Sequence, residues 1–216
     1  MPDILSVKDL QVSRKKDSAM IKVIDGLSFD LDAGQIIDVT GPSGCGKSTM
    51  IAALAFMIHK DGGTIELEGK HQAEFDPVLW RTKVSLILQK AVMIKGSVRD
   101  NLLLPWKLKI RKDSEIPGDD VLRFHLDKVG LQQINLDRNA EELSGGEQSR
   151  ISLLRSLLTR PRVLLLDETD APLDRKTARQ VLTFLQEYIR DKEMGIIRVQ
   201  HHDWDDAASK RIELSK

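Results

Sequence analysis

A glycine-rich segment that follows an apolar run constrains this chain more than any other feature. Residues 35–40 lead directly into GPSGCGKST at 41–49, and the stretch 48–58 is rich in Ala, Leu and Met, which favours a helix. Glycines at such a junction allow successive backbone N–H groups to turn inward around phosphate oxygens, and the helix N-terminus adds its dipole. The segment therefore predicts a strand, a phosphate-binding loop and a helix, as an α/β nucleotide-binding fold requires.

The residues expected to surround the phosphates lie in this loop and in the first turn of the helix: Gly41, Pro42, Ser43, Gly44, Cys45, Gly46, Lys47, Ser48 and Thr49. In the pattern G-x-x-x-x-G-K-S, Lys47 reaches the β and γ phosphates and the Ser48 hydroxyl binds Mg²⁺. Cys45 is the sole cysteine, so no internal disulfide is expected. Its position near a helix N-terminus predicts a thiol that N-ethylmaleimide modifies and bound nucleotide protects, unless it is a small buried filler.

Two later apolar runs also end in polar side chains. VLLLDE at 163–168 is expected to place Asp167 where it holds a metal and Glu168 where it polarises water, and another run ends in His201 and His202. An acidic pair after an apolar strand is by itself more typical of a solvated turn, but the phosphate loop favours the catalytic interpretation. The carboxyl ends of strands in an open parallel sheet are where such folds bind ligands.

The remaining pattern predicts one α/β domain with a mainly parallel sheet, flanking helices and two additions. The stretches 4–12 and 27–31 favour an N-terminal antiparallel β subdomain, joined through a turn at 32–34. Residues of about 98–140 contain helical pieces broken by prolines, which predicts an inserted α-helical subdomain. Residues of about 1–97 and 141–216 would then form the α/β core with its antiparallel part.

Charge and composition limit the partners. Lys plus Arg equals Asp plus Glu at 33 each, so no nucleic-acid partner is expected. No apolar run approaches the roughly 20 residues of a membrane helix, and the N-terminus has no leader pattern, which predicts a cytoplasmic protein.

The order of these motifs resembles that of the ATP-binding subunits of ABC transporters, and the resemblance covers nearly the whole chain. The phosphate loop is followed by Gln89, by LSGGEQ at 143–148, by VLLLDE, by Leu173 and Asp174, and by a late histidine. LSGGEQ is highly specific to that family. The resemblance implies a P-loop NTPase fold of ABC type, ATP and Mg²⁺ as cofactors, ATP hydrolysis, and a separate integral membrane permease that holds the chain at the inner face of the cell membrane.

The resemblance also implies a head-to-tail homodimer in the ATP-bound state, with each ATP between the phosphate loop of one chain and the LSGGEQ segment of the other. The nucleotide-binding residues expected outside the loop are Ser144, Gly145, Gly146, Glu147, Gln148 and Asp174. The segment also fits on physical grounds, because Ser144 is able to cap a helix whose free N–H groups bind an anion.

Catalytic roles carry over by the same resemblance. Gln89 contacts Mg²⁺ and the attacking water, and Asp167 holds the metal together with the Ser48 hydroxyl. Glu168 is the general base, assisted by a histidine that steadies the γ phosphate. The family pattern places that histidine directly before an acidic residue, which favours His202 over His201.

Three departures from the family pattern are visible. Many relatives stack an aromatic side chain on adenine near the N-terminus, whereas residues 11–14 have none, so that base stacking is weak or Arg14 lies over the ring. Ala171 lacks the hydroxyl that normally contributes across the dimer contact. Asp38 lies in an expected buried strand, where a charge is costly unless it is paired.

The segment SVRDNLLLPWKLK at 97–109 is most similar to bacterial subunits assigned to iron export. The alternative is a soluble ABC-type ATPase that acts on DNA or ribosomes, although the coiled-coil and zinc insertions of that class are absent. A regulator without turnover would need a defect at Lys47 or Glu168, and both are intact. We also expect the permease to contact residues 91–106 around Met93, Ile94 and Trp106, whereas residues 102–104 fit a buried position at least as well.

Overall fold

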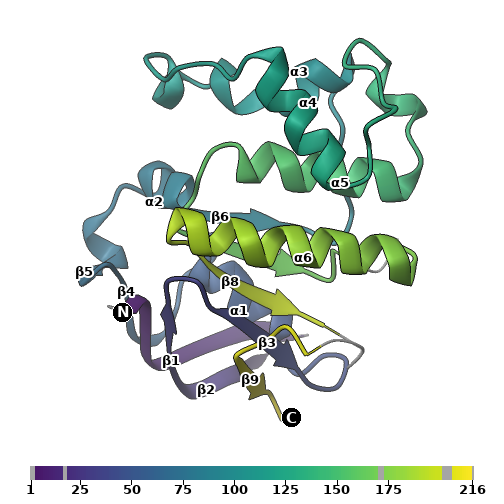
Figure 1. Cartoon of the computed structure of the whole chain (residues 1–216). Coiled ribbons are helices and arrows are strands. Elements are labelled where there is room, and N and C mark those ends of the chain that lie inside the picture. Colours follow the sequence, from purple (N-terminus) through teal and green to yellow (C-terminus); the bar gives the residue numbers. More distant parts are fainter. Residues whose placement is uncertain (1–2, 17–18, 170–172, 201–205, 216) are drawn as a thin grey trace. The chain divides into compact units, whose positions relative to one another are not determined.

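The structure is a computed structural model that describes residues 3–16, 19–169, 173–200 and 206–215 (Figure 1). The chain forms two compact units. The first contains Met1–Leu86, Pro161–Glu168 and Ile189–Lys216, and the second contains Ile87–Arg160 and Thr169–Tyr188. The second unit thus includes residues 98–140, for which the sequence predicts a helical insertion.

A five-stranded sheet has the order β6-β7-β8-β3-β9. Its strands are β6 (Val84–Ile87), β7 (Val163–Asp167), β8 (Gly195–Val199), β3 (Ile36–Thr40) and β9 (Lys210–Glu213). The pairs β7–β8, β8–β3 and β3–β9 are parallel, which confirms the predicted parallel sheet. Val199 is in register with Val39 on one side and with Asp167 on the other, so the carboxyl ends of three central strands are level.

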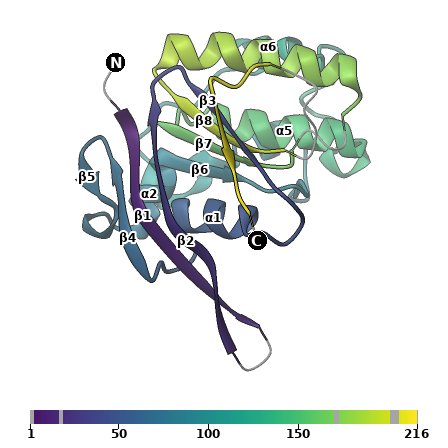
Figure 2. The same ribbon diagram turned by 90° about the horizontal axis from the view of Figure 1, so that it is seen from below.

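An antiparallel sheet of order β2-β1-β4-β5 forms the N-terminal part of the first unit. It contains β1 (Asp3–Lys16), β2 (Ala19–Asp32), β4 (Gly62–Leu67) and β5 (Lys70–His71). β1 and β2 are longer than the sequence pattern predicts, and the far end of their hairpin projects from the unit (Figure 2). The predicted turn after β2 is present, with Gly34 at φ 77°.

The core of the first unit surrounds the helix that follows the phosphate loop, α1 (Lys47–Leu54). Buried Met50, Ile51 and Leu54 of α1 pack with apolar side chains from both sheets. The helix is shorter than predicted, because buried side chains satisfy its last carbonyls: Gln72 Nε2 donates to Ala53 O at 3.1 Å, and Trp80 Nε1 donates to Leu54 O at 2.8 Å. These donors come from η1 (Gln72–Glu74) and from α2 (Pro77–Lys83).

Asp38 of β3 has a partner that local sequence patterns do not indicate. Arg198 lies beside it on β8 and donates from Nε to Oδ1 at 2.7 Å and from Nη2 to Oδ2 at 2.9 Å. The Asp38 side chain is 1% exposed and that of Arg198 is 7% exposed, so this bidentate pair spans two central strands inside the sheet.

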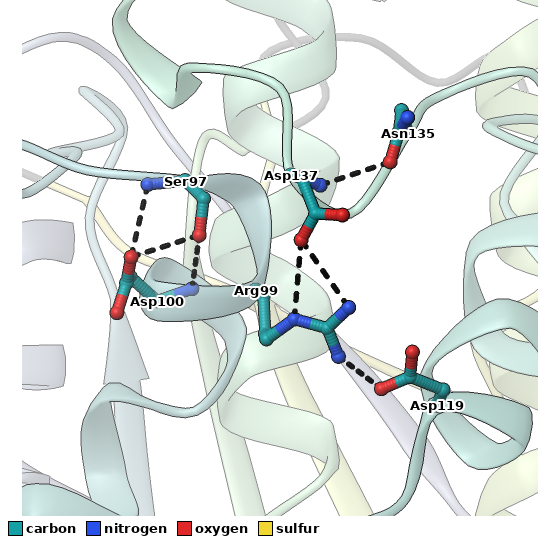
Figure 3. Close-up of polar contacts among 6 residues, drawn as sticks. All are labelled: Ser97, Arg99, Asp100, Asp119, Asn135 and Asp137. Carbon is teal, nitrogen blue, oxygen red and sulfur yellow. Dashed lines mark hydrogen bonds and ion pairs between the residues drawn. The ribbon is translucent and has the colours of Figure 1, made fainter.

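The second unit is mainly helical. It contains α3 (Val98–Leu102), η2 (Leu104–Lys107), η3 (Lys109–Arg111), α4 (Asp119–Lys128), η4 (Ala140–Glu142), α5 (Gly145–Leu157) and most of α6 (Arg175–Lys192). Arg99 of α3 links segments that are distant in sequence, because its guanidinium bonds to Asp119 at the start of α4 and to Asp137 (Figure 3).

Candidate functional site

The phosphate loop has the backbone conformation that its glycines predict. Gly41, Gly44 and Gly46 have φ angles of 142°, 80° and 108°, a region that side chains other than glycine rarely adopt. A Cβ on Gly41 would stand 2.3 Å from the Leu214 carbonyl oxygen, and a Cβ on Gly46 would stand 2.6 Å from Val23 Cγ1. Two of the three glycines are therefore required by close packing as well as by the turn.

Lys47 directs its ammonium group back into the loop. Its Nζ donates to Gly41 O at 2.7 Å and to Pro42 O at 3.3 Å, and the residue is only 6% exposed. The positive charge therefore lies beside the backbone of the phosphate loop, where phosphate oxygens are expected to bind. Cys45, by contrast, is 4% exposed and belongs to the hydrophobic core. The structure therefore supports the buried-filler alternative and argues against ready modification by N-ethylmaleimide.

Ser48 and Asp167 come together at the carboxyl ends of the strands in the parallel sheet. Ser48 Oγ of α1 donates to Asp167 Oδ1 at the end of β7, at 3.3 Å. Adjacent oxygen ligands of an octahedral Mg²⁺ lie about 3 Å apart, because each is about 2.1 Å from the ion. The two side chains fit a shared Mg²⁺ of the kind that is held by few protein ligands and by substrate phosphates. Consistently, no group of three or more His, Cys, Asp or Glu side chains gathers as a metal site among the described residues.

Glu168 has a left-handed backbone conformation, with φ of 52°, directly after β7. This conformation costs a residue other than glycine about 1–3 kcal/mol and persists where the surroundings enforce it. Here the Glu168 N–H donates to Val199 O of β8 at 3.3 Å. The strained turn places Glu168 in the lining of the cavity that contains the phosphate loop.

That cavity has a volume of about 570 Å³ and lies entirely within the first unit. Its lining combines the phosphate loop, Glu168 and the β1–β2 hairpin: Arg14, Lys15, Ile21, Val23, Ser43, Gly44, Gly46, Lys47, Ser48, Thr49 and Glu168. A cavity of this size accommodates a small-molecule ligand, and its lining combines apolar, polar and charged side chains.

Ser144 caps α5 as the sequence predicts. Its hydroxyl accepts from the Glu147 N–H at 3.3 Å, and the Glu147 carboxylate accepts from the Ser144 N–H at 2.7 Å, forming a capping box. Partial burial alone would raise the pKa of Glu147, but the hydrogen bonds from Ser144 and the positive charges of Arg138 and Arg150 together lower the pKa. Gly145 and Gly146 form the first helical turn, and a Cβ on Gly145 would meet nothing within 4 Å. A second N–H-rich helix end is thus open to a ligand.

Neighbouring residues of the LSGGEQ segment stabilise this helix end. Gln148 Nε2 donates to Leu143 O at 3.0 Å, and Arg150 donates to the carbonyls of Gly146 and Val129 at 3.2 and 3.0 Å. Asp174 caps α6 in a similar way, because its Oδ1 accepts from the backbone N–H groups of Lys176 and Thr177. The nucleotide contacts predicted for Glu147, Gln148 and Asp174 remain predictions.

Gln89 and the late histidine are the remaining residues of the predicted catalytic set. Gln89 lies in the second unit, exposed and two residues after β6. His201, His202 and Ala171 lie outside the described residues.

The segment predicted to contact a permease has a firmly held backbone. Arg155 Nη2 donates to Val92 O at 3.0 Å, while buried Asn101 accepts from Ile94 N at 2.8 Å and donates to Ile94 O at 3.0 Å. The Val92 side chain is 64% exposed, whereas Ile94 is half-buried and Leu102 is fully buried. For Leu102 the core alternative is correct, and Val92 is the exposed apolar side chain of this loop.

The sequence of this chain resembles those of known proteins. A family described as ABC transporter matches residues 24–171. This chain belongs to the ABC transporter family. It is 36% identical over 180 residues to the probable iron export ATP-binding protein FetA of Escherichia coli, covering 83% of this chain and 78% of that protein. It is 34% identical over 215 residues to the phosphonates import ATP-binding protein PhnC of Wolinella succinogenes, covering 93% and 74%.

A solved structure supports the fold assignment. A dimeric ATP-binding cassette in a post-hydrolysis state with ADP and Pi superposes with a TM-score of 0.81, at 21% identity, over 97% of this chain and 94% of that one. The family match and the curated relatives make the chain an ABC-type ATPase subunit, as the motif order predicts. No helix within the described ranges has both the length and the apolar character that a membrane span requires.

Sequence motifs did not identify every residue at the site of this ABC ATPase subunit. Ile21 and Val23 line the cavity, although nothing in their local pattern distinguishes them from other strand residues. Only the tertiary structure brings their strand against the phosphate loop. Arg14, for which the sequence suggests a contact with the base, is in the same lining.

Proposed function

We propose that this ABC ATPase subunit hydrolyses ATP with Mg²⁺ and powers transport through a separate integral membrane subunit at the cytoplasmic face of the membrane. The observation that carries the proposal is the shared cavity of Lys47, Ser48 and Glu168, with Asp167 bonded to Ser48 at its edge. These side chains supply a cation for phosphate, oxygen ligands for a metal and a carboxylate for water within one small volume.

Each side chain has a distinct task in this mechanism. Loop N–H groups and Lys47 bind the β and γ phosphates and hold them in position. Ser48 and Asp167, joined by Gln89, would hold Mg²⁺, which when bound neutralises charge on the phosphates. Glu168 orients the attacking water and accepts its proton, and His202 steadies the γ phosphate.

The second anion site explains why two chains would act together. The N-terminus of α5, capped by Ser144 and opened by Gly145 and Gly146, has N–H groups directed out of the helix. We infer that it binds the γ phosphate held by the phosphate loop of a second copy, arranged head to tail. ATP would then close the homodimer, and hydrolysis would release it.

Iron is the transported substrate, and export the direction, that the similarity to the probable iron export protein favours. This assignment rests on the likeness to a probable iron export protein and on the segment 97–109, while another relative is named for phosphonate import. Copurification from detergent-solubilised membranes would identify the permease. Host cells that lack the subunit should accumulate iron under iron load, and normal iron content together with lost phosphonate uptake would contradict export.

The central test is Glu168→Gln. This change removes the base and leaves the phosphate loop intact, so steady ATP hydrolysis should fall by at least about 100-fold while ATP still binds. The variant should accumulate as an ATP-bound dimer in gel filtration with Mg-ATP, and as a monomer without nucleotide.

Glu193→Gln is a matched control. Glu193 has the same left-handed backbone, with φ of 51°, but its exposed side chain faces Arg162 at 3.7 Å, outside the cavity. The Glu193→Gln variant should hydrolyse ATP at the parent rate. If Glu168→Gln keeps the parent rate as well, Glu168 is not the base. If it loses ATP binding, the change has damaged the loop and the assignment of separate roles is wrong.

A further inference from the structure

A short segment of the second unit, residues 107–112, combines cations with aliphatic side chains. Its sequence is KLKIRK, and it begins at the last residue of η2 and includes all of η3. Four of its six residues are Lys or Arg, and the acidic residues Asp113 and Glu115 come only after it. Positive and negative side chains balance over the whole chain at 33 each. This basic segment is therefore a local concentration of positive charge.

Two large side chains hold the basic segment in an ordered loop. Trp106, directly before it, donates from Nε1 to the Glu115 carbonyl oxygen at 2.8 Å, which closes the loop around residues 107–114. The Arg111 guanidinium lies over the Trp106 ring, 5.8 Å from its centroid, and Arg111 Nη2 donates to Thr159 O at 3.2 Å. The remaining side chains of the segment are thus presented on a defined backbone.

Two aliphatic side chains of this ordered loop are exposed. Leu108 is 55% exposed and Ile110 is 38% exposed. A single exposed apolar side chain is common on protein surfaces and needs no explanation. Two of them that alternate with cations in one loop indicate a contact surface.

The lysines of the basic segment differ in their partners. Lys107 forms an ion pair with Asp100, with Nζ 2.8 Å from Oδ1. Lys109 and Lys112 are exposed, and their side chains have no hydrogen bond or ion pair with any other described residue. Two ammonium groups beside two exposed aliphatic side chains are therefore available to an external partner that carries negative charge.

A lipid bilayer that contains anionic phospholipid matches both properties of the basic segment. Anionic headgroups attract Lys and Arg side chains near the surface, and aliphatic side chains enter the boundary between headgroups and acyl chains. A folded protein partner would need a surface complementary in shape to this loop, whereas a fluid lipid surface adapts to it. The charge and the apolar side chains together favour the lipid surface.

We propose that residues 107–112 bind the anionic surface of the membrane directly. Leu108 and Ile110 enter the headgroup region, while the lysines meet the lipid phosphates. The inference goes beyond the proposed function, because contact with lipid needs neither nucleotide nor a permease. A few cations and two aliphatic side chains give weak and reversible binding, so this contact adds to the attachment through a permease and does not replace it.

Cosedimentation of the full chain with lipid vesicles, without nucleotide, tests the proposal. The protein should bind vesicles of phosphatidylglycerol mixed with phosphatidylcholine and should not bind vesicles of phosphatidylcholine alone. High salt should release it, because salt screens charges at the surface. Lys109→Gln combined with Lys112→Gln should weaken binding by about 30-fold. Leu108→Asp should weaken it by about tenfold or more.

Two matched controls separate the basic segment from general effects of charge. Lys8→Gln combined with Lys192→Gln removes the same charge from exposed positions outside the segment. Ile116→Asp introduces a carboxylate at a side chain that is 60% exposed and lies beyond the segment. Both controls should bind vesicles as the parent does. ATP hydrolysis in solution should stay at the parent rate in every variant, since none of these residues lines the phosphate-loop cavity.

Three outcomes would overturn the proposal. Equal binding to both kinds of vesicle would show that anionic lipid is not recognised, and equal weakening by the controls would show that the segment is not the site. Absence of binding to phosphatidylglycerol vesicles would exclude the lipid contact. If the double lysine variant then also lost copurification with the permease, the segment would be a protein contact instead. A parent that binds vesicles but does not hydrolyse ATP would refute only the proposed ATPase function.

Discussion

At the scale of single residues, the buried charges of Asp38 and Arg198 form a bidentate ion pair. A buried charge is stabilised only when an opposite charge and hydrogen bonds replace its water, and the two short bonds between these side chains do so. They join β3, which leads into the phosphate loop, to β8, which is in register with β7 at Asp167. The pair therefore fixes the register of the strands that carry the site.

Breaking this pair should destabilise the protein strongly. Asp38→Ala leaves the Arg198 guanidinium in the sheet without its carboxylate, and the free energy of unfolding should fall by about 3–5 kcal/mol in urea denaturation. Asp38→Leu combined with Arg198→Met should recover most of the loss, because an apolar pair needs no desolvation.

The exposed pair of Lys22 and Asp25 is the comparison, with side chains 45% and 68% exposed. Asp25→Ala should cost no more than about 1 kcal/mol, as exposed ion pairs do. If Asp38→Ala costs as little, the buried pair does not determine the register.

At the scale of elements, helix ends decide what the two glycine-rich segments do. α1 begins at Lys47, directly after Gly46 of a tight loop, whereas α5 begins at Gly145 with the capping box of Ser144 and Glu147. Each cap leaves N–H groups available for an anion. One chain therefore has two helix ends, of different construction, that offer N–H groups to an anion.

The capping box predicts a pH dependence of stability. The folded-state pKa of Glu147 lies below its usual value, so its carboxylate stabilises the fold above about pH 4.3, and this contribution is lost as pH falls through the lowered pKa. The difference in urea midpoint between the parent and Glu147→Gln should be present at pH 7 and should shrink as the pH falls below about 4.3 and through the lowered pKa of Glu147.

Ser144→Ala removes a group that does not titrate in this range. Ser144→Ala should lower the free energy of unfolding by about 1 kcal/mol at pH 7. This loss should stay nearly constant as the pH falls, until Glu147 is protonated. If the difference in urea midpoint between the parent and Glu147→Gln instead widened as the pH falls, the result would contradict a lowered pKa of Glu147.

At the scale of the whole molecule, the proposed transport function requires a contact surface for the membrane subunit. The loop around Val92 is suited to that contact, because Arg155 and Asn101 hold its backbone while the Val92 side chain stays exposed. An ordered loop with an exposed apolar side chain fits a short helix from the permease.

Val92→Asp should abolish copurification with the permease and uncouple transport, while ATP binding and the unfolding midpoint stay near parent values. Ile116→Asp is the control, since Ile116 is equally exposed at 60% but lies outside this loop. Normal copurification of Val92→Asp would place the contact elsewhere. Ile94→Asp is a less suitable test because Ile94 is half-buried, and the aspartate would also disturb the loop.

The sequence by itself determined the features that depend on neighbouring residues. The phosphate loop, the cap of α5 at Ser144 and the apolar strand before Asp167 each need only a few consecutive residues, because turns, caps and strands are local in their chemistry. The motif order also predicted the family correctly.

Only the tertiary structure decided the features that join distant segments. Asp38 and Arg198 are 160 residues apart, and no local pattern predicts that their strands are neighbours. α1 ends early because Trp80, 26 residues beyond Leu54, donates to its last turn. Arg14 and Ile21 reach the cavity of the phosphate loop because Val23 of the β1–β2 hairpin packs on Gly46. In each case a buried or paired group is satisfied by a partner that becomes its neighbour only when the chain folds.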